Sequence, residues 1–244
     1  MWRIDSYTSP FDRRPCQDRL VIRNMRSGGY VAALFDGNGK KNDIVDFCAQ
    51  ALPRRLAELP LGNARPYMLR SFTEVAEEAL RLKEGGSSAA IACLAEDGRA
   101  YLAVLGNSLI IANRVDHGIY VSPESNSERA FGRREMGRTV SVVPELDEME
   151  LCVGDWLCLT SEGLLNPAGK TYVADRRELI SLLSQGTNAR EVVLHFEKKY
   201  GKKDDASLIV CRFFPQAIVA HAQVPEPYLL AGATATRTFE LAAA

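Results

Sequence analysis

Short apolar runs that end in glycine turns alternate along the chain with longer stretches of helical periodicity. Residues 20–23 and 30–36 predict the two strands of a hairpin around Gly28-Gly29. Apolar side chains then recur about every 3.6 residues over residues 42–56 and again over residues 66–83, which predicts two helices. The first third of the chain is therefore expected to form a hairpin followed by a helix pair.

The rest of the chain repeats this order. Asp97-Gly98 and Gly106-Asn107 are turns between β-rich runs, and the polar residues 122–138 predict a long loop. The predicted strands are residues 87–96, 99–105, 108–114, 118–122, 139–143, 149–153, 155–161 and 206–214, and the predicted helices are residues 175–184 and 189–200. Hairpins indicate antiparallel sheets, and helix pairs must cover sheet faces as outer layers. The pattern therefore favours an α+β sandwich over a parallel βαβ fold.

We expect one domain over residues 1–214 and a C-terminal tail over residues 215–244. The tail is rich in Ala, Thr and Pro and lacks a clear period, which is typical of a loosely held segment. The alternative is a short interaction segment, because large apolar side chains are costly to leave in solvent; those of the tail are Tyr228, Leu229, Leu230 and Phe239.

Composition and charge narrow the classes of partner. The 30 Lys and Arg residues against 31 Asp and Glu residues give a net charge of −1, without the basic excess that nucleic acid or an anionic membrane would require. No run approaches the ~18 apolar residues of a membrane span, and the N-terminus lacks the apolar core of a signal peptide. The cysteines are scattered without a CxxC pair, so we expect reduced thiols and a cytoplasmic protein.

Acidic residues lie at the ends of four predicted strands. Asp36 and Glu162 follow strands, whereas Asp18 and Asp204 precede them, and in antiparallel sheets these ends can share one edge. One such acid alone is more often a turn or capping residue. Four carboxylates at one edge would repel one another unless a hard divalent cation neutralised them, and Mg²⁺ and Mn²⁺ prefer such oxygen ligands. Two such ions can activate water for attack on a phosphoryl group.

The order of the motifs resembles the PP2C (PPM) family of metal-dependent serine/threonine phosphatases. The matching stretches lie between residues 13 and 212 and read RRPCQDR, ALFDGNG, GGSSAAIA, LAVLGNSLIIANR, GDWLCLTSEGLLNP and DDASLIV. Each is a weak signal alone, but six in the family's order form a specific pattern. The resemblance implies a four-layer α-β-β-α sandwich, two Mn²⁺ or Mg²⁺ ions, and a protein substrate that carries phosphoserine or phosphothreonine.

The resemblance also implies roles for individual residues. Asp36 would bridge two metals, and the carbonyl of Gly37 would bind one of them. Asp18 would act mostly through metal-bound water. Glu162 and Asp204 would complete the shell of the second metal.

Arg13 stands five residues before Asp18, where the family has a phosphate-binding arginine. Its guanidinium fork suits phosphate oxygens. Arg14 beside it leaves the assignment open, and a plain surface arginine is the alternative.

Three positions depart from the family pattern. Asn107 replaces an Asp that often serves a third, weaker metal site, so the resemblance gives that site little support. Glu162 replaces an Asp and is one methylene longer, and a shift of about 1 Å in a metal or a water can cost ~10²-fold in rate. Asn38 replaces a His that could act as the general acid, which other family members also lack.

Two functions from different classes stay open. The first is a working phosphoprotein phosphatase, which the acids and Arg13 favour. The second is a pseudophosphatase that keeps the fold as a binding or regulatory scaffold with a protein partner, which Asn107 and Glu162 favour. A phosphatase of small molecules is a third reading. The resemblance places a substrate-facing flap at residues 122–138. An acidic phosphopeptide could be met there by Arg129, Arg133, Arg134 and Arg138; a solvated loop is the alternative.

Overall fold

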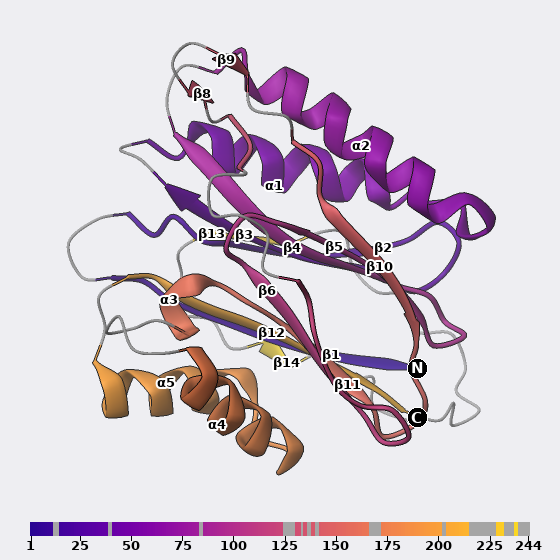
Figure 1. The fold of residues 1–244 in the computed structure, drawn as a ribbon, viewed down its shortest axis with the longest axis vertical. Helices are drawn as coiled ribbons and strands as arrows, with labels where there is room; N and C mark the ends of the chain where they lie inside the picture. Colours follow the sequence, from indigo (N-terminus) through magenta and orange to yellow (C-terminus); the bar gives the residue numbers. More distant parts are fainter. Residues whose placement is uncertain are drawn as a thin grey trace.

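The computed structural model describes the chain over residues 1–11, 15–38, 41–82, 85–123, 130–132, 134–135, 138–139, 142–165, 172–201, 204–214, 228–231 and 237–238. The elements form four layers in the order helix pair, sheet, sheet, helix pair (Figure 1). The predicted α+β sandwich of two antiparallel sheets flanked by helix pairs is confirmed.

Over the described residues, each of the two large sheets has six strands, and all neighbouring strands within these sheets run antiparallel. Sheet A has the order β14 (Arg237–Thr238), β1 (Trp2–Ser9), β12 (Ala206–Phe213), β11 (Trp156–Thr160), β6 (Leu109–Arg114) and β7 (Gly118–Val121). Sheet B has the order β10 (Glu145–Glu150), β5 (Arg99–Leu105), β4 (Gly86–Leu94), β3 (Tyr30–Asn38), β2 (Arg19–Asn24) and β13 (Tyr228–Ala231).

Helix pairs cover the outer faces of both sheets. Sheet B carries α1 (Asp43–Leu56) and α2 (Ala64–Ala79), which the 3₁₀ turn η1 (Leu61–Asn63) connects. Sheet A carries α4 (Tyr172–Ser184) and α5 (Ala189–Tyr200), and the single turn α3 (Glu162–Leu165) follows β11. None of the helices in the described ranges is long and apolar enough to cross a membrane.

Strand β3 shows how one apolar run serves two cores. Val31, Ala33 and Phe35 face the helix pair α1–α2, whereas Ala32 and Leu34 face sheet A. Successive side chains of a strand point to opposite faces, so a strand that is buried on both sides must be apolar at every position. A third core fills the space between sheet A and the pair α4–α5.

Strand β1 was missed by the sequence analysis. It lies inside sheet A between β12 and β14, although it carries the buried polar side chains of Asp5, Ser6 and Ser9. These residues interrupt the apolar alternation that marks a half-buried strand. Strand β10 was predicted four residues too late, because its sequence ELDEME is largely polar.

The predicted loop at residues 122–138 lies outside the described residues at 124–129, 133 and 136–137, as does the strand predicted at residues 139–143 at its residues 140–141. The described part contains a short two-stranded ribbon of β8 (Arg134–Glu135) and β9 (Arg138–Thr139). Phe131 exchanges two backbone hydrogen bonds with Ser87 of β4, which ties this region to sheet B.

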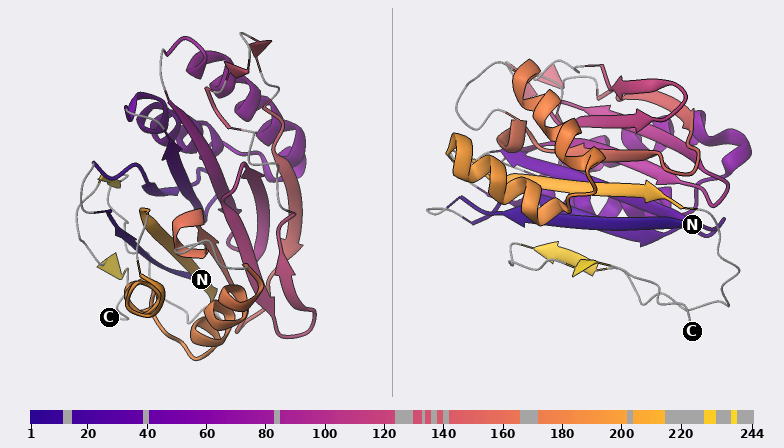
Figure 2. Two further views of the ribbon diagram at one scale, coloured as in Figure 1. Left: turned by 60° about the vertical axis from the view of Figure 1, so that its left-hand side comes forward. Right: turned by 90° about the horizontal axis from the view of Figure 1, so that it is seen from below.

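Two strands come from the region predicted as a tail. Strand β13 pairs with β2, and β14 pairs with β1, so each extends one sheet at its edge (Figure 2). The boundary between a domain over residues 1–214 and a tail over residues 215–244 stays a prediction.

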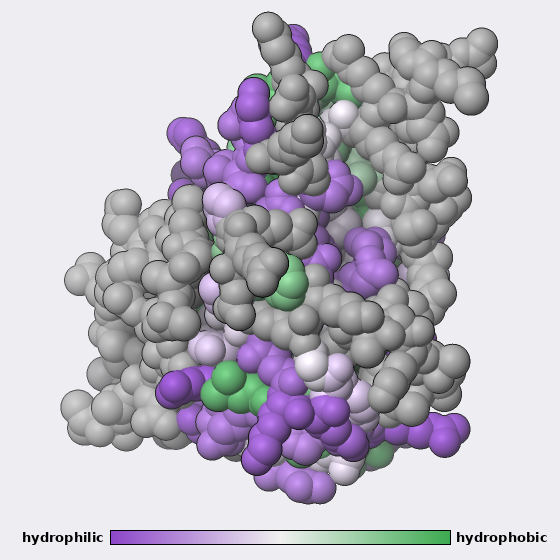
Figure 3. All heavy atoms as spheres, turned by 90° about the vertical axis from the view of Figure 1, so that its left-hand side faces the viewer, coloured by the Kyte–Doolittle hydropathy of each residue, from purple (hydrophilic) through white to green (hydrophobic). Residues whose placement is uncertain are grey.

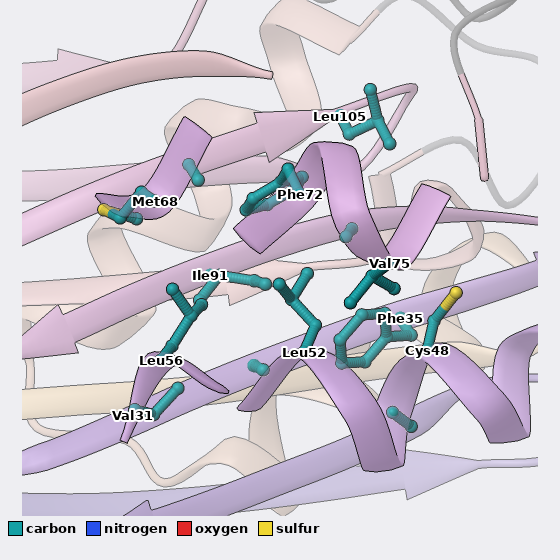
Figure 4. Close-up of a cluster of buried hydrophobic side chains, with 14 of the residues drawn as sticks. Val31, Phe35, Cys48, Leu52, Leu56, Met68, Phe72, Val75, Ile91 and Leu105 are labelled. Atoms are coloured by element: carbon teal, nitrogen blue, oxygen red, sulfur yellow. The ribbon is translucent and has the colours of Figure 1, made fainter. Parts of the chain in front are cut away.

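The core under α1 and α2 yields a stability prediction. Leu52 is fully buried and packs with Phe35 and Val75 (Figure 4). Leu52→Ala should lower the free energy of unfolding by about 2–5 kcal/mol, because it removes buried methyl groups and leaves a cavity. Leu69→Ala on the exposed side of α2 is the matched control. Equal urea midpoints for the two variants would contradict this description of the core.

Candidate metal centre

Strand register brings the four acids predicted from the sequence to one end of the sandwich. The β2–β3 pairing places Asp18 next to Asp36 at the end of sheet B, and the β11–β12 pairing places Glu162 near Asp204 at the end of sheet A. The charge of Asp36 interacts with those of the other three carboxylates, which indicates that these ends of the two sheets lie close together. Figure 3 views the side on which α3 lies in Figure 1, where the described residues are mostly hydrophilic.

Asp18 is the most deeply buried of these acids, with 1% of its surface exposed. Among the described residues, its Oδ2 atom has no hydrogen-bond partner. Desolvation, followed by the charge of Asp36, raises the pKa of Asp18 well above its ordinary value, while the hydroxyls of Ser207 and Ser161 lower it. A buried carboxylate oxygen without a partner is costly, and a cation or a hydrogen-bond donor at this point would offset that cost.

The pKa of Asp36 is raised for similar reasons. Desolvation and the charges of Asp204 and Glu162 raise its pKa to about 7, although the backbone N–H of Glu162 donates a hydrogen bond that opposes the rise. Carboxylates that share a site without a counter-charge resist ionisation, because each repels the others. A cation placed among them would remove this penalty.

Two glycines allow the backbone to close around the site. A Cβ atom on Gly37 would lie 2.8 Å from the carbonyl oxygen of Gln17, and one on Gly163 would lie 1.9 Å from that of Asp205. Both contacts are too short for any other residue. Gly37 and Gly163 are therefore required by packing, whether or not a metal is bound.

The two departures Asn107 and Glu162 contact each other. The Nδ2 atom of Asn107 donates a short hydrogen bond to Oε2 of Glu162. Asn107 lies in the turn between β5 and β6, and Glu162 begins α3 after β11. The contact thus joins the loop that leaves sheet B to a strand end of sheet A.

Asp205 is a functional candidate that the sequence analysis missed. It is buried, and its two carboxylate oxygens accept hydrogen bonds from the backbone N–H groups of Phe11 and Gln17, both at 2.6 Å. It therefore holds both ends of the segment that contains Arg13 and leads to Asp18. The doublet Asp204-Asp205 was the available signal, because two adjacent acids before a strand point in opposite directions.

The predicted site residues thus divide into two groups. Asp18, Asp36, Gly37, Glu162 and Asp204 come together, whereas Arg13 lies outside the described residues, as do Arg14, Arg129 and Arg133 of the other predicted contacts. Within the described part of the chain, no three His, Cys, Asp or Glu side chains are already arranged to hold a metal ion. The ligand roles of the five residues remain predictions.

The chemistry of these residues nevertheless fits a hard divalent cation. Carboxylate and carbonyl oxygens are the ligands that Mg²⁺ and Mn²⁺ prefer. The buried Asp18 oxygen without a partner among the described residues and the raised pKa of Asp36 are both features that a bound cation would relieve.

Comparison with solved structures identifies the fold. Compared by sequence, the chain matches no protein-family model and no curated protein. In three dimensions it is similar to Stp1 from Staphylococcus aureus, with a TM-score of 0.70 at 14% identity over 88% of this chain and 96% of that chain. The S. agalactiae serine/threonine phosphatase gives 0.64 at 19% identity over 87% and 99%.

The Mycobacterium tuberculosis serine/threonine phosphatase PstP/Ppp is also similar, with a TM-score of 0.61 at 16% identity over 88% of this chain and 99% of that chain. The protein therefore has the fold of the bacterial PP2C-type serine/threonine phosphatases, and the resemblance seen in the motifs is confirmed at the level of the fold.

The raised pKa of Asp36 predicts how the stability of the metal-free protein changes with pH. A carboxyl with a higher pKa in the folded state stabilises the fold while it is protonated, and this contribution is lost as the pH rises from about 4 to about 7. Asp36→Asn should therefore raise the free energy of unfolding by about 1–4 kcal/mol at pH 8 and change it little at pH 4. Urea unfolding in EDTA measures this, with the exposed Asp116→Asn as control. An unchanged or lower stability of Asp36→Asn at pH 8 would contradict the charge crowding.

Asp205 and Asp204 make a matched pair for a second prediction. Asp205→Ala leaves two backbone N–H groups without their acceptor and should cost about 2–4 kcal/mol in the free energy of unfolding, because hydrogen bonds to charged groups are strong. Asp204→Ala changes an exposed residue and should cost much less. Urea unfolding of both variants shows which substitution lowers the free energy of unfolding more. A larger loss for Asp204→Ala would mean that Asp204 is the structural acid of the doublet.

Proposed function

We propose that the protein is a metal-dependent phosphoprotein phosphatase that hydrolyses phosphoserine and phosphothreonine with a binuclear metal centre. The observation that carries the proposal is the meeting of Asp18, Asp36, Glu162 and Asp204 at one end of the sandwich, with a buried Asp18 oxygen that lacks a partner among the described residues. The solved structures of similar fold are serine/threonine phosphatases, which supports the same chemistry. Fold alone would be a weak argument, so the proposal depends on the acids.

Each residue has a part in this proposal. Asp36 and Asp204 would hold the cations with Glu162 and the carbonyl of Gly37, and Asp18 would contact them through water. When bound, two divalent cations would activate a water molecule as the nucleophile and stabilise negative charge on the phosphoryl oxygens.

Phosphate ester hydrolysis sets the remaining requirements. Water attacks phosphorus, the bond from phosphorus to the serine or threonine oxygen breaks, and that oxygen leaves as an alcohol after it gains a proton. Arg13 would orient the phosphate through its guanidinium. Asn38 is exposed and its amide is not an acid, so solvent would supply the proton.

A scaffold without catalysis explains these features less well. A binding module gains nothing from carboxylates that raise one another's pKa, and removing one of them would stabilise it. All six cysteines are free thiols, which suits action in a reducing compartment such as the cytoplasm. A phosphoprotein would be the substrate, without nucleic acid or membrane.

The direct test is Mn²⁺ binding by calorimetry, with hydrolysis of p-nitrophenyl phosphate and of a phosphothreonine peptide measured on the same sample. We expect Mn²⁺ binding and metal-dependent turnover of both substrates. Asp36→Ala should abolish binding and lower turnover by at least about 10³-fold, since it removes a carboxylate that would hold the cations. The exposed control Asp116→Ala should behave as the wild type.

Each outcome decides one part of the proposal. Mn²⁺ binding without turnover would support a regulatory scaffold. Turnover of p-nitrophenyl phosphate but not of the peptide would favour a small-molecule substrate. Wild-type turnover by Asp36→Ala would show that the site lies elsewhere.

A further inference from the structure

The hydrogen bond between Asn107 and Glu162 joins the two residues at which the predicted metal site departs most from its family pattern. Considered separately, each of these two residues predicts a weakened metal site. In the structure they form one unit, because the amide of Asn107 contacts the additional length of the Glu162 side chain. The two departures should therefore be judged together.

The turn that carries Asn107 is held firmly in place. Gly106 adopts a positive φ of 82°, which lets the chain reverse between β5 and β6. The side chain of the buried Ser108 is hydrogen-bonded to that of Ser88 at 2.8 Å, and Ser88 lies opposite Asp36 in the β3–β4 ladder. The position of Asn107 is thus tied to the strand that carries Asp36.

The chemistry of the pair is asymmetric. An ionised carboxylate only accepts hydrogen bonds, so the amide group of Asn107 must face Glu162 with its N–H donor. A carboxylate at position 107 would instead add a further negative charge beside Asp36, Asp204 and Glu162. The amide holds one oxygen of Glu162, and a carboxylate has a second oxygen with which to bind a cation.

We propose that Asn107 is a positioning residue that fixes the longer Glu162 side chain so that one carboxylate oxygen is presented to the divalent cation of the proposed site. The inference rests on the proposed function, because it assigns Glu162 to a metal. In this arrangement Asn107 is neutral and donates a hydrogen bond. An acid at the same position would need a further cation to neutralise its charge. Compared with the aspartates that the family pattern has at both positions, the Asn107–Glu162 pair carries one negative charge fewer and one methylene more.

The test is a double-mutant cycle with the Mn²⁺ dissociation constant from calorimetry as the readout. Asn107→Ala and Asn107→Leu both remove the donor, and Leu keeps the branching and the number of side-chain heavy atoms of Asn. Each should weaken Mn²⁺ binding by about 10-fold or more, as loss of a residue that orients a metal ligand typically does. Glu162→Ala should weaken it further.

The decisive value is the effect of Asn107→Ala in the Glu162→Ala background. If Asn107 acts through Glu162, this second substitution should change the dissociation constant by less than about 2-fold, because coupled residues are not additive. Full additivity would overturn the inference. Glu162→Asp should also weaken binding, since the shorter side chain cannot reach both the amide and the ion; tighter binding would overturn it as well.

Two controls separate this inference from the proposed function. Asn113→Ala alters an asparagine on β6 that is hydrogen-bonded to Ser184, away from the acids, and should leave Mn²⁺ binding unchanged. Thermal unfolding in EDTA confirms that each variant is folded. Absence of Mn²⁺ binding by the wild type would defeat the proposed function. If the wild type binds Mn²⁺ and the folded Asn107 variants bind it equally tightly, the inference is wrong but the proposed function stands.

Discussion

Repulsion among carboxylates is the constraint on which the end of the sandwich depends. Four acids meet where the two sheets end, and the pKa of Asp36 rises to about 7 because burial and the charges of Asp204 and Glu162 disfavour its ionised form. A fold tolerates such an arrangement only when the surrounding backbone holds it in place. The rest of the site can be understood as the structure that keeps these charges together.

Much of that structure is supplied by neutral donors. Ser161 and Ser207 lower the pKa of Asp18, and the N–H of Glu162 does the same for Asp36. Asp205 differs, because it uses its own charge to bind two backbone N–H groups and so fixes the chain before Asp18. The acid beside it, Asp204, remains exposed. Two adjacent carboxylates therefore serve separate purposes, one of them structural.

The layers and most strands could be predicted from the sequence because β3, β4 and β11 each contain an uninterrupted apolar run and glycine turns lie between many of the strands. Strand β1 could not be predicted, because Asp5 and Ser6 are polar yet buried. Asp5 accepts a hydrogen bond from the backbone N–H of Ala189, which belongs to a helix far along the chain. For the same reason Asn107 and Glu162 were read as two separate defects. Local patterns indicate which residues are acidic, whereas partners that are 55 positions apart appear only in three dimensions.

The place of β1 has a consequence for how the chain reaches its native state. Trp2 lies opposite Phe213, and Asp5 lies opposite Thr238, so the first strand of the chain has its neighbours near the far end. Such pairings close very long loops, and their entropy must be offset before they contribute stability. During synthesis, sheet B can assemble its central hairpins early. Sheet A cannot be completed until β12 has been made, because β12 pairs with β1 on one side and with β11 on the other. Only then can Asp18 and Asp204 be brought to the same end of the molecule.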